Sequence, residues 1–417
     1  MWDVVVLGSV LAGLGWAEEL RLRRARSAVP VRIHVNGTRG KSTVTRLLMG
    51  VLLTAGRRAL GKVTGTEARW LLPDGTEAPV QRRGGRATIR EQARALERAA
   101  RLGCEALVLE CMALHPEALW TSEHRMIQST VGVITNVRED HGDVMGRDRA
   151  EIARTLANTI PVEGHLVVGD EQAFPLLARE ARRRGTQPLL APPVPPSRAP
   201  QELRPYLAWH APENLGVVFQ VAQLLGIEER VTWRGMAAAL PEPGTARWTR
   251  VEGPGPLGAL LIDGLAANDP DSLARVLRGA LAACPPAEPF EVRVIYHHRH
   301  DRAERALRFG QRLPELLRVG AGVGSVTVWA TGDPGGARLL GGGARQGPTE
   351  PGALLRRWRL RPAGDPACEE PPGVVVLAGG NTRGARGWQG AYEPWQPVPL
   401  GAEGRLVPPG EGGADHG

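Results

Sequence analysis

The residues whose types and spacing point most directly to chemistry form a glycine-rich run early in this 417-residue chain. The run follows an alternating apolar stretch, typical of a buried strand, and precedes apolar residues at helical spacing. Its backbone amides and the first helical turn would bind phosphate oxygens, while its lysine and serine would contact outer phosphates and a Mg²⁺ ion. The sequence therefore predicts a phosphate-binding loop, made of Gly37, Thr38, Arg39, Gly40, Lys41, Ser42 and Thr43. It has the shorter G-T-x-G-K-S form, since Val35 stands six positions before the lysine, where the standard motif has glycine.

Acidic, amide and imidazole side chains stand at or just beyond the ends of two further predicted strands. Glu110 closes the strand at residues 106–110, Asn136 closes the strand at residues 131–136, and His141 follows it. The carboxyl ends of parallel strands gather at one edge of an open sheet, where ligands bind. We therefore expect Glu110 and His141 to hold a metal ion with Ser42 and to assist phosphoryl transfer beside the loop.

Strand and helix patterns alternate along most of the chain, which would place these residues at the edge of a parallel sheet. The alternation predicts an α/β fold, with a phosphate-loop, doubly wound parallel-sheet domain followed by a smaller Rossmann-like domain. Glycine and proline are frequent at residues 241–258, which favours a domain boundary there. The expected divisions are an N-terminal segment at residues 1–29, a nucleotide-binding domain at 30–245, a C-terminal α/β domain at 246–400 and a disordered tail at 401–417.

The N-terminal segment is apolar at residues 4–17 and carries four arginines soon afterwards. With residues 1–3 added, a helix here would be nearly long enough to cross a bilayer. The basic residues follow the apolar run, which is the reverse of the order in a cleavable signal peptide. We therefore expect a hydrophobic helix that forms a single membrane anchor, a location at the cell membrane, and catalytic domains in the cytoplasm. An amphipathic or core helix is the alternative.

The formal net charge of +8 raises the question of a polyanionic partner such as nucleic acid. The basic residues are almost all arginine, because Lys41 and Lys62 are the only lysines in the chain. The arginines form no long block with interleaved aromatic residues, and aromatic residues make up only 4% of the sequence. We therefore expect no nucleic-acid partner. The four cysteines show no zinc-type spacing, which indicates free thiols.

Several motifs in the same order resemble those of the Mur ligase superfamily. Within that superfamily the sequence is most similar to the catalytic subunits of poly-γ-glutamate synthases, over roughly residues 1–320. The motifs are the phosphate loop, Glu110, T-N-x-x-x-D-H at 135–141, I-P-x-x-G-x-L-V at 160–167, E-N-L-G at 213–216, Arg247 and I-D-x-x-A-x-N-D-P at 262–270.

The resemblance implies an ATP-dependent, ADP-forming amide ligase that activates a γ-carboxyl group as an acyl phosphate and adds glutamate. It implies ATP and Mg²⁺ as cofactors, with Mn²⁺ as a possible substitute, and Lys41, Glu110 and His141 as catalytic residues. Carried over by position, Asn136, Asn214, Arg247 and Asp263 would contact the nucleotide. It further implies glutamate and the growing poly-γ-glutamate chain as substrates, and partner subunits in the membrane that take the polymer outward.

One departure from the family concerns lysine. Many Mur-type ligases hold their metal with a carbamylated lysine beyond the D-H pair, but this chain has no lysine after Lys62. Another carboxylate or water must therefore take that place.

Residues that bind the incoming substrate are harder to assign. Lys62 and Thr66, in the loop G-K-V-T-G-T, are candidates for phosphate or carboxylate binding, and Lys62 as a solvated loop residue is the alternative. Arg299 and Arg302 would suit carboxylates through paired hydrogen bonds, or form a solvated basic loop. Two other functions stay open: a folylpolyglutamate or peptidoglycan-type ligase, and a phosphate-loop membrane ATPase or regulator without ligase activity.

Overall fold

The computed structural model describes residues 2–380 apart from several short segments. Those segments are residues 66–67, 83–86, 139–143, 208–209, 240–246, 253–257, 266–268, 285, 287–288, 317–322, 359–360 and 363–372. Two predicted site residues, Thr66 and His141, and the predicted tail at residues 401–417 lie outside the described residues. The chain divides into two compact units, one spanning Met1–Pro241 and the other Glu242–Gln396.

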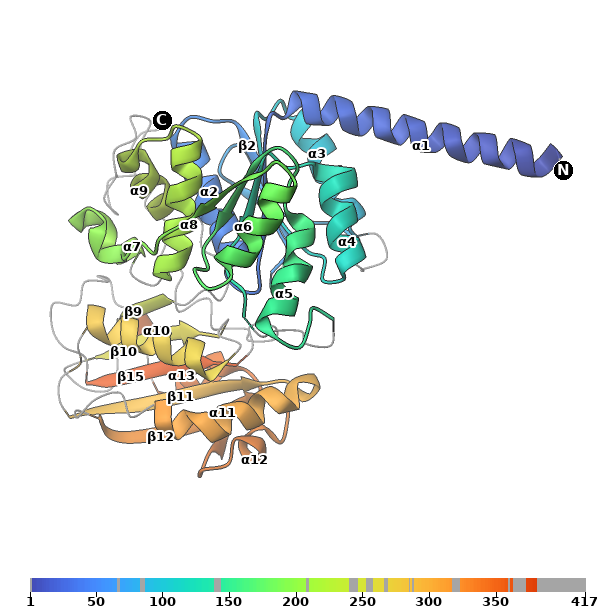
Figure 1. Cartoon of the computed structure of the whole chain (residues 1–417). Helices are drawn as coiled ribbons and strands as arrows, with labels where there is room; N and C mark the ends of the chain where they lie inside the picture. Colours follow the sequence, from blue (N-terminus) through green and yellow to red (C-terminus); the bar gives the residue numbers. More distant parts are fainter. Residues whose placement is uncertain are drawn as a thin grey trace, which may run out of the picture. The chain divides into compact units, whose positions relative to one another are not determined.

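The first unit is built on a central sheet with helices packed around it (Figure 1). The strand order of the sheet is β4-β3-β2-β5-β1-β6-β7-β8. The run from β2 to β8 is parallel, as predicted, whereas β3 and β4 extend it in antiparallel fashion. Its strands are β1 (Val31–Asn36), β2 (Ala59–Val63), β3 (Arg69–Leu71), β4 (Glu77–Pro79), β5 (Ala106–Glu110), β6 (Val131–Ile134), β7 (His165–Val168) and β8 (Gln187–Leu190).

Helices cover both faces of this sheet, because its strands alternate their apolar side chains between two cores. In β5, Ala106 and Val108 join the core formed with α2, α8 and α9, while Leu107 and Leu109 join the core formed with α3. The helices are α1 (Trp2–Ala28), α2 (Lys41–Thr54), α3 (Arg90–Arg101), α4 (Pro116–Thr121), α5 (Arg149–Leu156), α6 (Phe174–Arg183), α7 (Arg204–Leu207), α8 (Pro212–Leu224), α9 (Glu229–Ala238) and the π-helical segment η1 (Ser122–Ile127).

The second unit has its own sheet and its own apolar core. The strand order is β13-β12-β11-β15-β10-β9-β14, with β9 and β14 antiparallel and the others parallel. The strands are β9 (Arg247–Glu252), β10 (Ala259–Gly264), β11 (Phe290–His298), β12 (Val323–Gly332), β13 (Arg345–Gln346), β14 (Arg361–Pro362) and β15 (Val374–Gly379). The helices are α10 (Pro270–Ala283), α11 (Ala303–Leu316), α12 (Gly336–Leu340) and α13 (Pro351–Arg357).

The N-terminal segment differs from the sequence-based expectation. A helix does form, α1, and its last turns pack Leu22 and Ala25 against the α3 core. In the part of the chain that the structure describes, however, no helix combines the length and the apolar character needed to cross a bilayer. The apolar run is too short, since Glu18 and Glu19 already interrupt it. The prediction of a hydrophobic anchor helix, and with it the location at the cell membrane, is therefore wrong.

Candidate functional site

The phosphate-binding loop connects β1 to α2 and depends on two glycines with positive φ. Gly37 has φ of 129° and Gly40 has φ of 81°, values that side-chain-bearing residues rarely adopt. Space is also limiting, because a Cβ atom at Gly40 would lie 2.6 Å from Oδ1 of Asn214, at the start of α8. The loop and the predicted nucleotide contact Asn214 are thus brought together, and α2 begins directly afterwards at Lys41.

Lys41 lies over the loop that it terminates. Its Nζ donates hydrogen bonds to the carbonyl oxygens of Gly37, at 2.6 Å, and Thr38, at 3.3 Å. The ammonium group is therefore held at the N-terminus of α2, where backbone amides and the helix dipole also favour negative charge. This arrangement suits the outer phosphates of a nucleotide.

Asn136 fixes the loop from the end of the neighbouring strand. Its Oδ1 accepts hydrogen bonds from Thr38 Oγ1 at 2.7 Å and from the Arg39 amide at 3.0 Å, and its Nδ2 donates to the Arg39 carbonyl at 3.0 Å. The adjacent Thr135 donates its hydroxyl to the same carbonyl at 2.6 Å. The side chain that we expected to contact the nucleotide thus shapes the loop that would bind it.

Glu110 and Ser42 come together beneath the loop. The Ser42 hydroxyl donates to Glu110 Oε2 at 2.9 Å, and the backbone amide of Thr64 donates to the same oxygen at 2.6 Å. Both side chains are buried. A carboxylate and a hydroxyl at this spacing are the oxygen ligands that Mg²⁺ and Mn²⁺ accept, so the pair fits the predicted metal. Among the described residues no three His, Cys, Asp or Glu side chains gather into a fuller set, and His141 is not among them.

A cavity of about 250 Å³ adjoins these groups. Polar side chains on its wall come from the loop, from the end of β5 and from the segment before α3, while methionine, alanine and leucine supply an apolar part. Its polar wall includes Asn36, Thr38, Lys41, Thr64, Arg82 and Glu110.

Lys62 is a buried residue of strand β2 and not a solvated loop residue. Its Nζ lies 2.9 Å from Oε2 of Glu91, on α3, and 3.7 Å from the sulfur of Met112. Burial lowers the pKa of Lys62, and the contact with Glu91 opposes that shift.

The remaining predicted residues lie in α2 or in the second unit. Thr43 occupies the first turn of α2. Asp263 is buried in β10, where Oδ1 accepts from the Leu265 amide at 3.1 Å, and its backbone is in register with Arg247 of β9. Arg299 pairs with Asp301 at 2.6 Å, and Arg302 is exposed.

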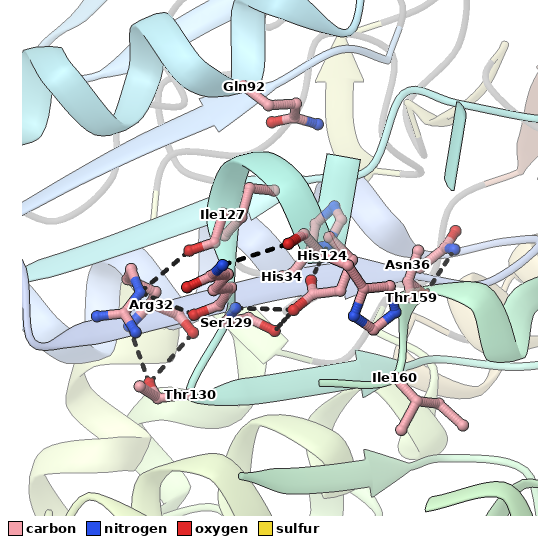
Figure 2. Close-up of polar contacts among 12 residues, drawn as sticks. Arg32, His34, Asn36, Gln92, His124, Ile127, Ser129, Thr130, Thr159 and Ile160 are labelled. Carbon is pink, nitrogen blue, oxygen red and sulfur yellow. Dashed lines mark hydrogen bonds and ion pairs between the residues drawn. The ribbon is translucent and has the colours of Figure 1, made fainter. Parts of the chain in front are cut away.

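A buried polar network around His34 of β1 was not predicted from the sequence (Figure 2). Nδ1 of His34 contacts Oε2 of Glu123 at 2.8 Å, and Oε1 of Glu123 accepts from the Ser129 amide and hydroxyl, each at 2.8 Å. Burial alone would lower the pKa of His34, but its interactions with Cys111 and Glu123 raise that pKa to about 10. No local pattern reveals this pair, because its members are 89 positions apart.

Asp170, just beyond β7, is a second residue that the sequence reasoning missed. Its carboxylate accepts from the backbone amides of Val137 and Ala173 and pairs with Arg149. Burial opposes ionisation, yet these hydrogen bonds hold the pKa of Asp170 below its usual range. The strand-end rule that identified Glu110 applies equally to Asp170 and would have found it.

Comparisons with known proteins identify the family of the chain. The family model described as the Mur ligase middle domain matches residues 35–189, and the model described as the poly-gamma-glutamate synthase CapB C-terminal domain matches residues 254–334. The chain is 36% identical over 314 residues to PGA synthase CapB of Bacillus subtilis, covering 74% of this chain and 78% of that protein. It is 40% identical over 265 residues to the capsule biosynthesis protein CapB of Bacillus anthracis, covering 63% of this chain and 56% of that protein.

Solved structures share the fold at low sequence identity. Escherichia coli FolC in complex with ADP superposes with a TM-score of 0.57 at 18% identity, covering 88% of this chain and 91% of that one. A bifunctional folylpolyglutamate synthase/dihydrofolate synthase from Yersinia pestis, complexed with AMPPNP and Mn ion, has a TM-score of 0.57 at 17% identity, with coverages of 90% and 93%. MurF ligase from Thermotoga maritima in complex with ADP gives 0.56 at 17% identity, with coverages of 89% and 82%.

Proposed function

Because the chain belongs to the family of the CapB poly-gamma-glutamate synthases, we propose that it is an ATP-dependent ligase that builds a γ-linked glutamate polymer. The observation that carries the proposal is the meeting of the phosphate loop with the Ser42–Glu110 pair at one cavity. A nucleotide's outer phosphates, a divalent cation and a carboxylate substrate all find suitable groups on that wall.

The proposed reaction solves a specific chemical problem. A carboxylate does not condense with an amine at neutral pH, because its oxygen is a poor leaving group. An oxygen of the γ-carboxylate would first attack the γ-phosphorus of ATP, forming a C–O–P bond and releasing ADP. The uncharged amine of the next glutamate would then attack the carbonyl carbon, forming the amide and releasing phosphate and one proton.

Named residues of this chain would serve the two steps. Lys41 and the loop amides would hold the transferred phosphate, and Asn136 would keep those amides in place. Ser42, Glu110 and His141 would hold the Mg²⁺ or Mn²⁺ ion, which when bound neutralises phosphate charge. Asn214, Arg247 and Asp263 would contact the nucleotide, and Arg299 and Arg302 are candidates for carboxylate binding.

The substrates and partners are also proposals. Glutamate and the growing γ-glutamyl chain as substrates are supported by the match to the poly-gamma-glutamate synthase CapB C-terminal domain and by the similarity to PGA synthase CapB. Partner subunits in the membrane, which would take the polymer outward, are supported by the family resemblance alone. The match to the CapB C-terminal domain favours a polymer synthase over a folylpolyglutamate synthase, whose solved structures share the fold only.

Mass analysis of the product tests the proposal. The purified full-length chain, supplied with ATP, Mg²⁺ and either D- or L-glutamate, should release ADP only when glutamate is present and should form γ-linked oligomers. Lys41→Ala should abolish this turnover while the protein stays folded, whereas Arg94→Ala, which removes an exposed charge from α3, should leave it unchanged. ADP release that ignores glutamate would instead indicate an ATPase without ligase activity. Full turnover in Lys41→Ala or His141→Ala would show that the site is wrongly placed.

A further inference from the structure

An ion-pair cluster of three residues, Arg82, Glu91 and Lys62, reaches the cavity from the segment before α3. Oε1 of Glu91 lies 2.9 Å from Nε of Arg82, and Oε2 lies 3.3 Å from Nη2, so that the carboxylate engages one edge of the guanidinium. Lys62 binds the same carboxylate from the interior, with Nζ 2.9 Å from Oε2. Two cations thus share one anion, which leaves the cluster with one net positive charge.

The three residues differ in how far each reaches the cavity. Lys62 is fully buried and Glu91 is 5% exposed, whereas the Arg82 side chain keeps 24% of its surface exposed and forms part of the cavity wall. Within the described part of the chain, Glu91 engages Nε and Nη2 of Arg82, which leaves Nη1 for a ligand. A buried support of this kind orients a guanidinium without neutralising it.

The rest of the wall indicates the shape of that ligand. Lys41 supplies positive charge from the phosphate loop, and Arg82 supplies it from a different element. Apolar lining comes from Met112, Leu114 and Met145. A molecule with two anionic ends joined by a short aliphatic stretch satisfies all three features, since one end would lie at the phosphate loop and the other at Arg82.

We propose that Arg82, oriented by Glu91 and Lys62, binds the α-carboxylate of the glutamyl unit whose γ-carboxylate is activated at the phosphate loop. This inference rests on the proposed function and assigns its substrate contact. The two methylene groups of the glutamyl side chain lie against the methionine and leucine side chains. Arg82 is a binding residue in this scheme, and Glu91 and Lys62 act through it as positioning residues.

The arrangement explains how the γ-carboxylate is chosen over the α-carboxylate. Both groups of a terminal glutamyl unit are anionic, and either could be phosphorylated. When Arg82 holds the α-carboxylate, only the γ-carboxylate can reach the transferred phosphate. The buried lysine that we expected to contact phosphate or carboxylate itself therefore serves by supporting an arginine.

The experiment compares two short γ-linked glutamate oligomers, one with a free α-carboxylate on its terminal unit and one with an α-carboxamide there. For the free carboxylate, Arg82→Gln should raise the KM of the oligomer by roughly 10- to 100-fold, the range expected for loss of a charge-assisted hydrogen bond. The KM of ATP should stay within about twofold. For the carboxamide, wild type and Arg82→Gln should perform alike. Glu91→Gln should shift the KM in the same direction by less, and Arg94→Gln should change nothing.

Two results would overturn the assignment. An unchanged oligomer KM in Arg82→Gln would remove Arg82 from substrate binding, and a raised KM for ATP instead would make it a phosphate contact. Thermal melting identifies any variant that fails to fold, and Arg82→Lys, which keeps the charge but loses the forked geometry, provides a milder substitution. Calorimetry of oligomer binding in the presence of AMPPNP measures the role of Arg82 independently of turnover. A wild-type protein that binds the oligomer but shows no turnover would refute the proposed function without refuting the role of Arg82.

Discussion

Removal of the Asn136 side chain should lower nucleotide affinity chiefly by loosening the phosphate loop that this side chain holds in place. Asn136→Ala deletes three hydrogen bonds that hold Thr38 and Arg39 in the phosphate loop. At about 1 kcal/mol each, the loss of these bonds should make the ordered conformation of the loop less stable by about 3 kcal/mol. If binding must restore that order, the affinity for AMPPNP with Mg²⁺ should fall by roughly a hundredfold, because each 1.4 kcal/mol corresponds to about tenfold.

Isothermal titration calorimetry measures this effect, and two further variants sharpen it. Asn136→Asp keeps the acceptor for Thr38 and Arg39 but loses the donor to the Arg39 carbonyl, a loss of about 1 kcal/mol or roughly fivefold in affinity. Because the substitution also adds a negative charge beside the proposed phosphate site, the affinity should fall by more than this. Asn158→Ala removes a hydrogen bond to the Thr155 carbonyl, away from the loop, and should leave affinity unchanged. A folded Asn136→Ala protein that binds AMPPNP within about twofold of wild type would refute the reasoning.

Three other perturbations follow from the same geometry. Glu110→Gln should raise the Mg²⁺ concentration needed for turnover by at least the roughly 10- to 100-fold that the loss of an outer-shell partner costs, and an unchanged Mg²⁺ titration would remove Glu110 from the metal site. Glu123→Gln should lower the free energy of unfolding by about 3–5 kcal/mol, because it leaves buried His34 without its charged partner. Because the pKa of His34 is raised to about 10, the stabilisation that wild type gains from protonated His34 is full below pH 6.5 and is lost as the pH rises through about 10. Urea unfolding should therefore show the difference in unfolding free energy between wild type and Glu123→Gln shrinking over that pH range. A difference that stays constant would contradict the ion pair. Asp170→Asn should destabilise the protein by about 1–3 kcal/mol near neutral pH and by less in acid. The lowered pKa of Asp170 means that the stabilisation from its carboxylate is present above pH 3.8 and is lost as the pH falls. A difference between the variant and wild-type melting curves that is the same at neutral and acidic pH would count against this role of Asp170.

The sequence was sufficient to predict the residues whose position follows from strand order. Glu110 ends β5 and Asn136 lies two residues beyond the end of β6, and these parallel strands flank β1, so the proximity of both residues to the phosphate loop follows from the fold class alone. The glycines and Lys41 were recognisable because their chemistry depends on a continuous stretch of backbone.

Residues that depend on contacts distant in sequence were not predictable in this way. The burial of Lys62 requires α3 to bring Glu91 against β2, and the sheet to continue through β3 and β4. Those two strands are only three residues long, too short for a periodicity to be recognised. The anchor prediction failed for a different reason, because the apolar run at residues 4–17 ends at Glu18 and Glu19 and is too short to cross a bilayer.

The edges of both sheets have a consequence for how copies of this protein can meet. In the described residues the first sheet ends at β4 and β8, and each of these strands contains a proline, Pro79 and Pro188. The second sheet ends at β13, two residues long, and at β14, which contains Pro362. Proline lacks the amide hydrogen that a neighbouring strand would bind, and a very short edge offers few bonds. Strand-to-strand joining between molecules is therefore disfavoured at these edges, and an assembly of this protein is expected to use helices and loops in preference to sheet edges.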